Sequence, residues 1–132
     1  MTLEQQRAAL AYRHVSLVKE SAETERKIYG SMALKLPVLI RTAGLCQALH
    51  FIRSRKKEAL DTLLQHLAEQ LRRVDSAIDG ADGLLAKVRA ADLSQYLWLS
   101  REALAAVEWY ARLAQSELKI DRTEDVNDQP SK

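Results

Sequence analysis

Apolar side chains recur every three or four residues along most of the chain, which is the spacing of one face of an α-helix. The cleanest stripe lies between residues 58 and 75 and has the a/d spacing of a heptad: Leu60, Leu63, Leu64, Leu67, Leu71 and Val74. Because this segment is too short for a free-standing coiled coil, the stripe predicts a helix packed antiparallel against others in a bundle.

The rest of the chain has the same helical period, interrupted by a few turn signals. The period predicts helices over residues 3–20, 45–55 and 84–89. It also predicts a helix from a cap at residue 21 or 24 to about residue 40, and a last helix from residue 92 or 94 to about residue 118. Pro37 predicts a kink or a restart, Asp79–Gly83 predicts a loop, and Ser100 marks a candidate break in the last helix. We therefore predict an all-α fold, a single compact helical bundle of about five to six helices.

Composition agrees with this fold and bounds the domain organisation. The 132 residues include only 4 Gly and 2 Pro, the two residue types that most disfavour a helix interior. We predict one helical bundle domain over residues 1–120. Residues 121–132 are polar and contain Pro130, which predicts a flexible C-terminal tail.

Cysteine usage and the absence of long apolar runs bear on the compartment. Cys46 is the single cysteine, so no intramolecular disulfide can form, and a reducing compartment is favoured. No basic leader precedes an apolar run, and no apolar run approaches the roughly 20 residues that cross a bilayer. These features predict a cytoplasmic protein without a membrane partner.

The net charge of +2 hides an asymmetry between the two halves of the chain. Residues 1–57 carry 11 Lys/Arg and 4 Asp/Glu, a net charge of +7, whereas residues 58–132 carry 9 and 14, a net charge of −5. Such a difference in net charge between the two halves indicates either an anionic partner at one end of the molecule or head-to-tail contact between copies of the chain. Chance variation along a solvated surface is the alternative.

Motifs that carry catalysis are missing from the sequence. There is no glycine-rich phosphate loop, nucleophile elbow or zinc-ligand spacing, and Cys46 with His50 supplies only two of the four ligands of a zinc site. We predict no catalytic residue, no metal, no cofactor and no small-molecule substrate. A metal-dependent nuclease that uses Asp79 and Asp82 is a distant alternative.

Basic residues concentrated in the N-terminal half are the candidates for contact with nucleic acid. Lys and Arg neutralise phosphates without reading sequence, and the scarcity of aromatic residues argues against a base-stacking platform. The predicted RNA backbone contacts are Lys35, Arg41, Arg53, Arg55, Lys56 and Lys57. A merely solvated basic surface is the alternative.

A second group of candidates concerns contact with another subunit. Arg7 and His14 fall one heptad apart inside the apolar sector of the first helix, and the last helix is apolar over most of its circumference, with Trp109, Tyr110 and Leu113 forming a second sector. Such a helix is either central in the bundle or covered by another subunit. We predict a subunit interface at these five residues. The alternative for Arg7 and His14 is snorkelling at the edge of the core.

Four stretches in a fixed order resemble the small-subunit family of type III-B CRISPR effector (Cmr) complexes. They are LEQQRA at 3–8, YGSMALKLPVLI at 29–40, GLCQALHF at 44–51 and YLWLSREAL at 96–104. His50 is bulkier and more polar than the family pattern leads one to expect. Lys35 and Arg41 are the plausible phosphate contacts inside these stretches.

The resemblance implies a small helical bundle without enzymatic activity that works in RNA-guided antiviral defence. It also implies that copies stack head to tail in a filament beside the backbone that holds the guide RNA, and help to hold the target strand. The implied partners are the other subunits of the effector complex, copies of the chain, and guide and target RNA. The alternative function is a helical adaptor that binds only protein, or the small subunit of a related type III complex.

Overall fold

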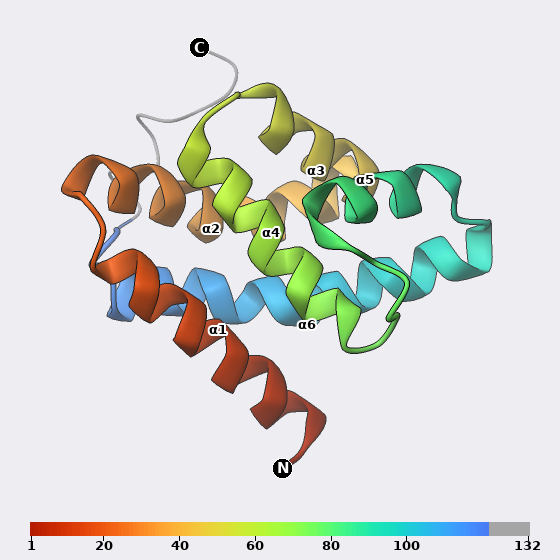
Figure 1. Cartoon of the computed structure of the whole chain (residues 1–132), viewed down its shortest axis with the longest axis horizontal. Coiled ribbons are helices and arrows are strands. Elements are labelled where there is room, and N and C mark those ends of the chain that lie inside the picture. Colours follow the sequence, from red (N-terminus) through yellow and green to blue (C-terminus); the bar gives the residue numbers. More distant parts are fainter. Residues whose placement is uncertain (122–132) are drawn as a thin grey trace.

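The computed structural model describes residues 1–121 and confirms the all-α prediction (Figure 1). The predicted tail, apart from Asp121, lies outside the described residues. Within residues 1–121 six helices follow one another: α1 Leu3–Lys19, α2 Glu23–Ala43, α3 Leu45–Ser54, α4 Glu58–Arg72, α5 Gly80–Ala90 and α6 Leu93–Ser116.

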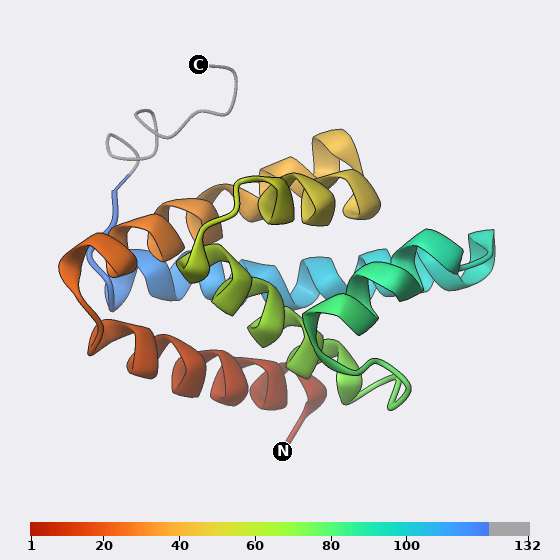
Figure 2. The same ribbon diagram turned by 45° about the horizontal axis from the view of Figure 1, so that its top comes forward.

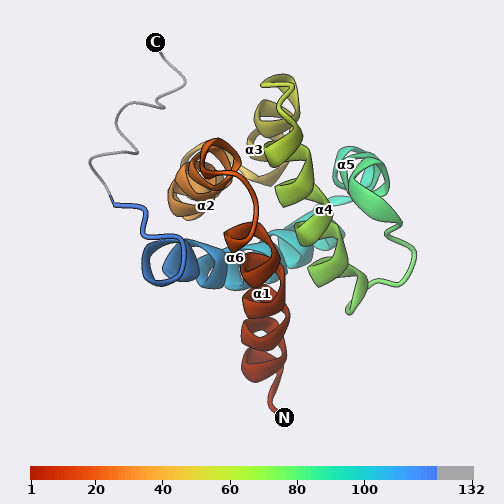
Figure 3. The ribbon, with the colours of Figure 1, turned by 60° about the vertical axis from the view of Figure 1, so that its left-hand side comes forward.

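The longest helix, α6, runs lengthwise through the bundle, and α1, α2 and α4 pack against it (Figures 1 and 2). Helices α2 and α5 lie on opposite sides of α4, as the view in Figure 3 shows. The α1–α2 turn lies at one end of the long axis and the α5–α6 turn at the other. Every leucine of the predicted α4 stripe is at most 2% exposed, so the period of the sequence identified the core face of this helix.

Side-chain caps define the start of two helices. Thr2 and Gln5 form a reciprocal capping box at α1, and the carboxylate of Asp92 accepts a hydrogen bond of 2.9 Å from the Gln95 backbone N–H at α6. Both arrangements satisfy backbone donors that a helix leaves free in its first turn. The N-cap of α2 is Ala22 rather than Ser21 or Thr24, because the Ser21 hydroxyl donates to the Val18 carbonyl instead.

Several expectations about helix interruptions are wrong. Helix α2 continues through Pro37, which is buried in the core, so the helix does not restart there and packing outweighs the loss of one backbone donor. The kink that Pro37 also predicts stays a prediction. Helix α6 passes Ser100 without a break. The predicted loop at Asp79–Gly83 is the first turn of α5, which begins at Gly80 because the Gln65 side chain accepts a hydrogen bond from the Ala81 N–H at 3.0 Å.

Candidate nucleic-acid interface

Three consecutive basic residues make the whole connection between α3 and α4. Arg55 is the C-cap of α3 and keeps helical backbone angles, Lys56 adopts a positive φ of 54°, and Lys57 is the extended N-cap of α4. A positive φ after a helix reverses the chain within a single residue and normally favours glycine. The tight turn therefore holds three cationic side chains close together on the surface.

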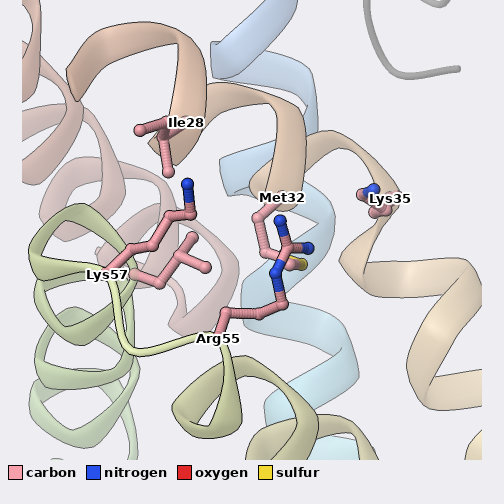
Figure 4. Close-up of a pocket in the computed structure, with 6 residues that line it drawn as sticks. Ile28, Met32, Lys35, Arg55 and Lys57 are labelled. Atoms are coloured by element: carbon pink, nitrogen blue, oxygen red, sulfur yellow. The ribbon is translucent and has the colours of Figure 1, made fainter. Parts of the chain in front are cut away.

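Lys35 on α2 joins this turn, and we call Lys35, Arg55, Lys56 and Lys57 the basic corner. Lys35, Arg55 and Lys57 line one small pocket together with Ile28. Figure 4 shows the Lys57 ammonium directed toward Ile28 and the Arg55 guanidinium beside Met32, with Lys35 further along α2. A volume of about 20 Å³ admits little more than one water molecule, so an anion would be held at the mouth of the pocket.

The cations of the turn lack anionic partners within the part of the chain that the structure describes. No carboxylate of residues 1–121 lies within 4.0 Å of Arg55, Lys56 or Lys57. The Arg55 guanidinium lies 5.8 Å from the centre of the Phe51 ring, a cation–π contact that orients it without neutralising its charge. The turn therefore presents positive charge that an external phosphate can neutralise.

The two other predicted RNA contacts are engaged in ion pairs. The guanidinium of Arg41 pairs with the Glu108 carboxylate on α6. Arg53 lies between two carboxylates, with its Nε 3.2 Å from Asp61 and its Nη1 2.9 Å from Asp82. Three of the six predicted residues, Lys35, Arg55 and Lys57, thus line one pocket. Lys56 lines another pocket with Arg53, while Arg41 and Arg53 are each engaged with carboxylates of the chain.

The predicted subunit interface is largely covered by the chain itself. Arg7 pairs with Glu102 at 3.0 Å, and its side chain is 12% exposed. Trp109 donates from its indole N–H to Glu4 at 3.1 Å. Trp109 and Leu113 keep part of their surface in solvent, whereas Tyr110 is fully buried.

His14, the remaining interface candidate, belongs to a buried polar network between α1, α2, α4 and α6. Its imidazole stacks on that of His66, with ring centres 3.9 Å apart. His14 Nδ1 lies 2.7 Å from the Tyr110 hydroxyl, and His66 Nδ1 lies 2.7 Å from the Tyr29 hydroxyl. Gln70 donates to the Tyr110 hydroxyl at 3.2 Å. His14 and Tyr110 are therefore buried within the chain and take part in its interior hydrogen bonding.

This network was not predicted from the sequence, although polar residues inside or beside an apolar sector were a signal for it. Arg7 and His14 lie inside the apolar sector of the first helix, and His66 and Gln70 lie at the edge of the α4 leucine stripe. Buried polar groups are almost always hydrogen-bonded. Two such residues on separate helices therefore indicate groups that pair with each other.

Burial sets the protonation of the network. Loss of solvation lowers the pKa of His66 to about 3, and the neighbouring His14 adds to this effect. Burial also lowers the pKa of His14, against the opposite influence of Glu69, whose carboxylate lies 3.3 Å from Nε2. Burial raises the pKa of both Tyr29 and Tyr110. The histidines and tyrosines are therefore neutral near pH 7, which fits their role as structural hydrogen-bonding groups.

The carboxylates considered for metal-dependent chemistry are spread over separate ion pairs. Asp79 lies 3.5 Å from Arg72, and Asp82 pairs with Arg53. Within residues 1–121 no three His, Cys, Asp or Glu side chains come together in a way that could hold a metal ion. In the same part of the chain, no helix has the length and apolar character needed to span a membrane.

Three comparisons connect this chain with known proteins. A family model described as "CRISPR-associated protein (Cas_Cmr5)" matches residues 3–117. The CRISPR system Cmr subunit Cmr5 of Thermus thermophilus is 50% identical over 100 residues, which cover 75% of this chain and 83% of that protein. The crystal structure of a CRISPR-associated Cmr5 family protein, also from Thermus thermophilus, superposes with a TM-score of 0.80 at 43% identity, over 89% of this chain and 98% of that one.

Proposed function

Because the chain belongs to the Cmr5 family of CRISPR-associated proteins, we propose that it is a non-catalytic small subunit of an RNA-guided type III-B (Cmr) effector complex. In this role it acts in the cytoplasm in antiviral defence. Copies of the chain stack beside the subunits that hold the guide, and their basic surface helps to keep target RNA along the guide. Cleavage belongs to other subunits of the complex.

The basic corner is the observation that carries the RNA part of this proposal. Three consecutive cations in one turn, with no carboxylate of the described residues within 4.0 Å, form a sequence-independent phosphate contact. A subunit that holds whatever target the guide selects needs this kind of contact, because base pairing with the guide already supplies the sequence specificity. Arg41 and Arg53 are the weaker candidates, since each already has a carboxylate partner.

The salt dependence of target binding tests this role in the assembled complex. The variant Arg55→Gln/Lys57→Gln removes two charges from the basic corner without touching the core. If both side chains contact phosphates, a plot of the logarithm of the association constant for target RNA against the logarithm of the salt concentration becomes less steep by about 1.4. This is about 0.7 for each lost contact with a single strand. The measurement is a titration of reconstituted complex with target RNA at several salt concentrations.

Arg112→Gln provides the matched control. Arg112 is an exposed arginine of α6 outside the basic corner, and we expect its loss to leave the slope unchanged. An unchanged slope in the double variant would contradict RNA contact at the basic corner and favour the adaptor that binds only protein. Failure of the chain to co-purify with larger CRISPR subunits and a guide RNA would contradict membership of the effector complex itself.

A further inference from the structure

The N-terminal half of α6 carries an exposed stripe that no part of the described chain covers. Leu93 and Leu97 are 73% and 55% exposed, and Arg101 is exposed. These three residues follow at i, i+4 and i+8 and therefore share one face of the helix. No carboxylate of residues 1–121 lies within 4.0 Å of Arg101. We call Leu93, Leu97 and Arg101 the tip stripe.

A groove of complementary character lies between the end of α1 and the beginnings of α2 and α4. It has a volume of about 430 Å³ and contains apolar wall residues, the buried rings of Tyr29 and His66, and two carboxylates. Leu17, one of the walls, is 64% exposed. Glu25 and Glu58 have no Lys, Arg or His partner within 4.0 Å in the described part of the chain. We call this feature the acidic groove.

The tip stripe and the acidic groove lie at opposite ends of the molecule. The stripe begins at the α5–α6 turn, and the groove is next to the α1–α2 turn, which is the other end of the long axis (Figures 1 and 2). The two surfaces of one molecule therefore cannot meet each other. They can meet between two molecules placed end to end.

We propose that the tip stripe of one copy docks in the acidic groove of the next copy. Leu93 and Leu97 pack on Leu17, and the Arg101 guanidinium reaches the carboxylates of Glu25 and Glu58 in a charge-assisted contact. A contact between two different faces of identical molecules does not close on itself, so it propagates as an open row. The inference rests on the proposed stacking of copies and assigns the two surfaces that make the contact.

Site-specific cross-linking in the assembled effector complex tests the proposal. In a Cys46→Ser background, Leu17→Cys and Leu97→Cys place one thiol in the groove and one on the stripe, and a short bismaleimide joins thiols of adjacent copies. We expect the chain with both cysteines to give a ladder of covalent oligomers. Each single-cysteine chain should give no ladder, and an equal mixture of the two should stop at dimers.

Charge reversal provides a second readout that requires no cross-linker. Arg101→Glu should weaken the association of copies about tenfold or more, because three carboxylates would then meet. Adding Glu58→Arg to the same chain should restore the association. Arg112→Glu, three turns further along α6, is the control and should have no effect.

The possible outcomes separate the inference from the proposed function. If the purified complex holds several copies but no ladder forms and Arg101→Glu leaves the copy number unchanged, the assignment of these two surfaces is overturned while the proposed function stands. If the chain is absent from the complex or present as a single copy, stacking itself fails and the inference fails with it. A ladder together with restored association in the charge-swapped chain would establish the contact.

Discussion

The buried polar network and the basic corner use polar side chains in opposite ways. In the interior, His14, His66, Tyr29 and Tyr110 meet partners of the same chain at hydrogen-bonding or stacking distance. At the surface, Arg55, Lys56 and Lys57 meet no carboxylate of the described residues within 4.0 Å. The first arrangement stabilises one conformation of the bundle, whereas the second leaves charge available for another molecule. Changes in the network should therefore affect stability, and changes in the corner should affect binding.

Truncation of Tyr110 should give the largest effect on stability. Tyr110→Ala empties the space of a fully buried ring and removes a partner of both His14 and Gln70, so we expect the free energy of unfolding to fall by about 3–5 kcal/mol. Chemical denaturation followed by circular dichroism measures this loss. Tyr12→Ala is the matched control, since Tyr12 is 52% exposed and its truncation should change stability by less than about 0.5 kcal/mol.

Acid should produce the next largest effect, again through the network. The pKa of His66 is lowered to about 3 in the folded chain and is about 6.5 in an unfolded one. Above pH 6.5 both states are neutral, and stability is complete. Between pH 6.5 and 3 the unfolded chain binds a proton that the folded one does not, so stability falls by about 1.4 kcal/mol per pH unit for this residue. The lowered pKa of His14 acts in the same direction.

Denaturation at pH 7.5 and pH 5 measures this dependence. His66→Gln keeps a hydrogen-bonding partner for Tyr29 but does not titrate, so it should be less stable at pH 7.5 and lose less on acidification. An equal loss in the parent chain and His66→Gln would contradict the assignment of the pH effect to His66.

The sequence predicted those parts of the molecule that depend on neighbours along the chain. The period of α4 identified its core face because burial follows helical spacing, and the run of three cations at 55–57 needed only a turn to become a surface cluster. The sequence could not predict that Lys35 lies near Arg55 and Lys57. Lys35 lines the same pocket as these two residues only once α2 has packed against α4. Neutralisation of Arg41 and Arg53 depends on Glu108 and Asp82, which are 67 and 29 residues away.

The same reasoning explains why the sequence did not predict the buried polar network. His14 and His66 lie on helices whose contact is fixed only by the crossing of α1 and α4. The hydrophobic period of a sequence indicates which side of a helix is buried. It does not specify which residue of another helix will contact that side.

The smallest predicted effect concerns the strain that the basic corner holds at Lys56. Its φ of 54° is costly for a residue with a Cβ atom, whereas glycine adopts this region freely. Lys56→Gly and Lys56→Ala remove the same charge, but only the first relieves the backbone. We expect the glycine variant to be more stable than the alanine variant by about 1 kcal/mol, as measured by denaturation.

Both Lys56 variants should lose the same amount of salt dependence in target binding, because that effect follows the charge alone. Equal stabilities would contradict backbone strain at Lys56, and unequal salt slopes would show that the shape of the turn matters for RNA contact as well as its charge. If the stabilities differ and the slopes agree, the chain carries a lysine at a position where glycine is more stable. Local stability is then given up for a positive charge, as expected of a surface that serves another molecule rather than the fold.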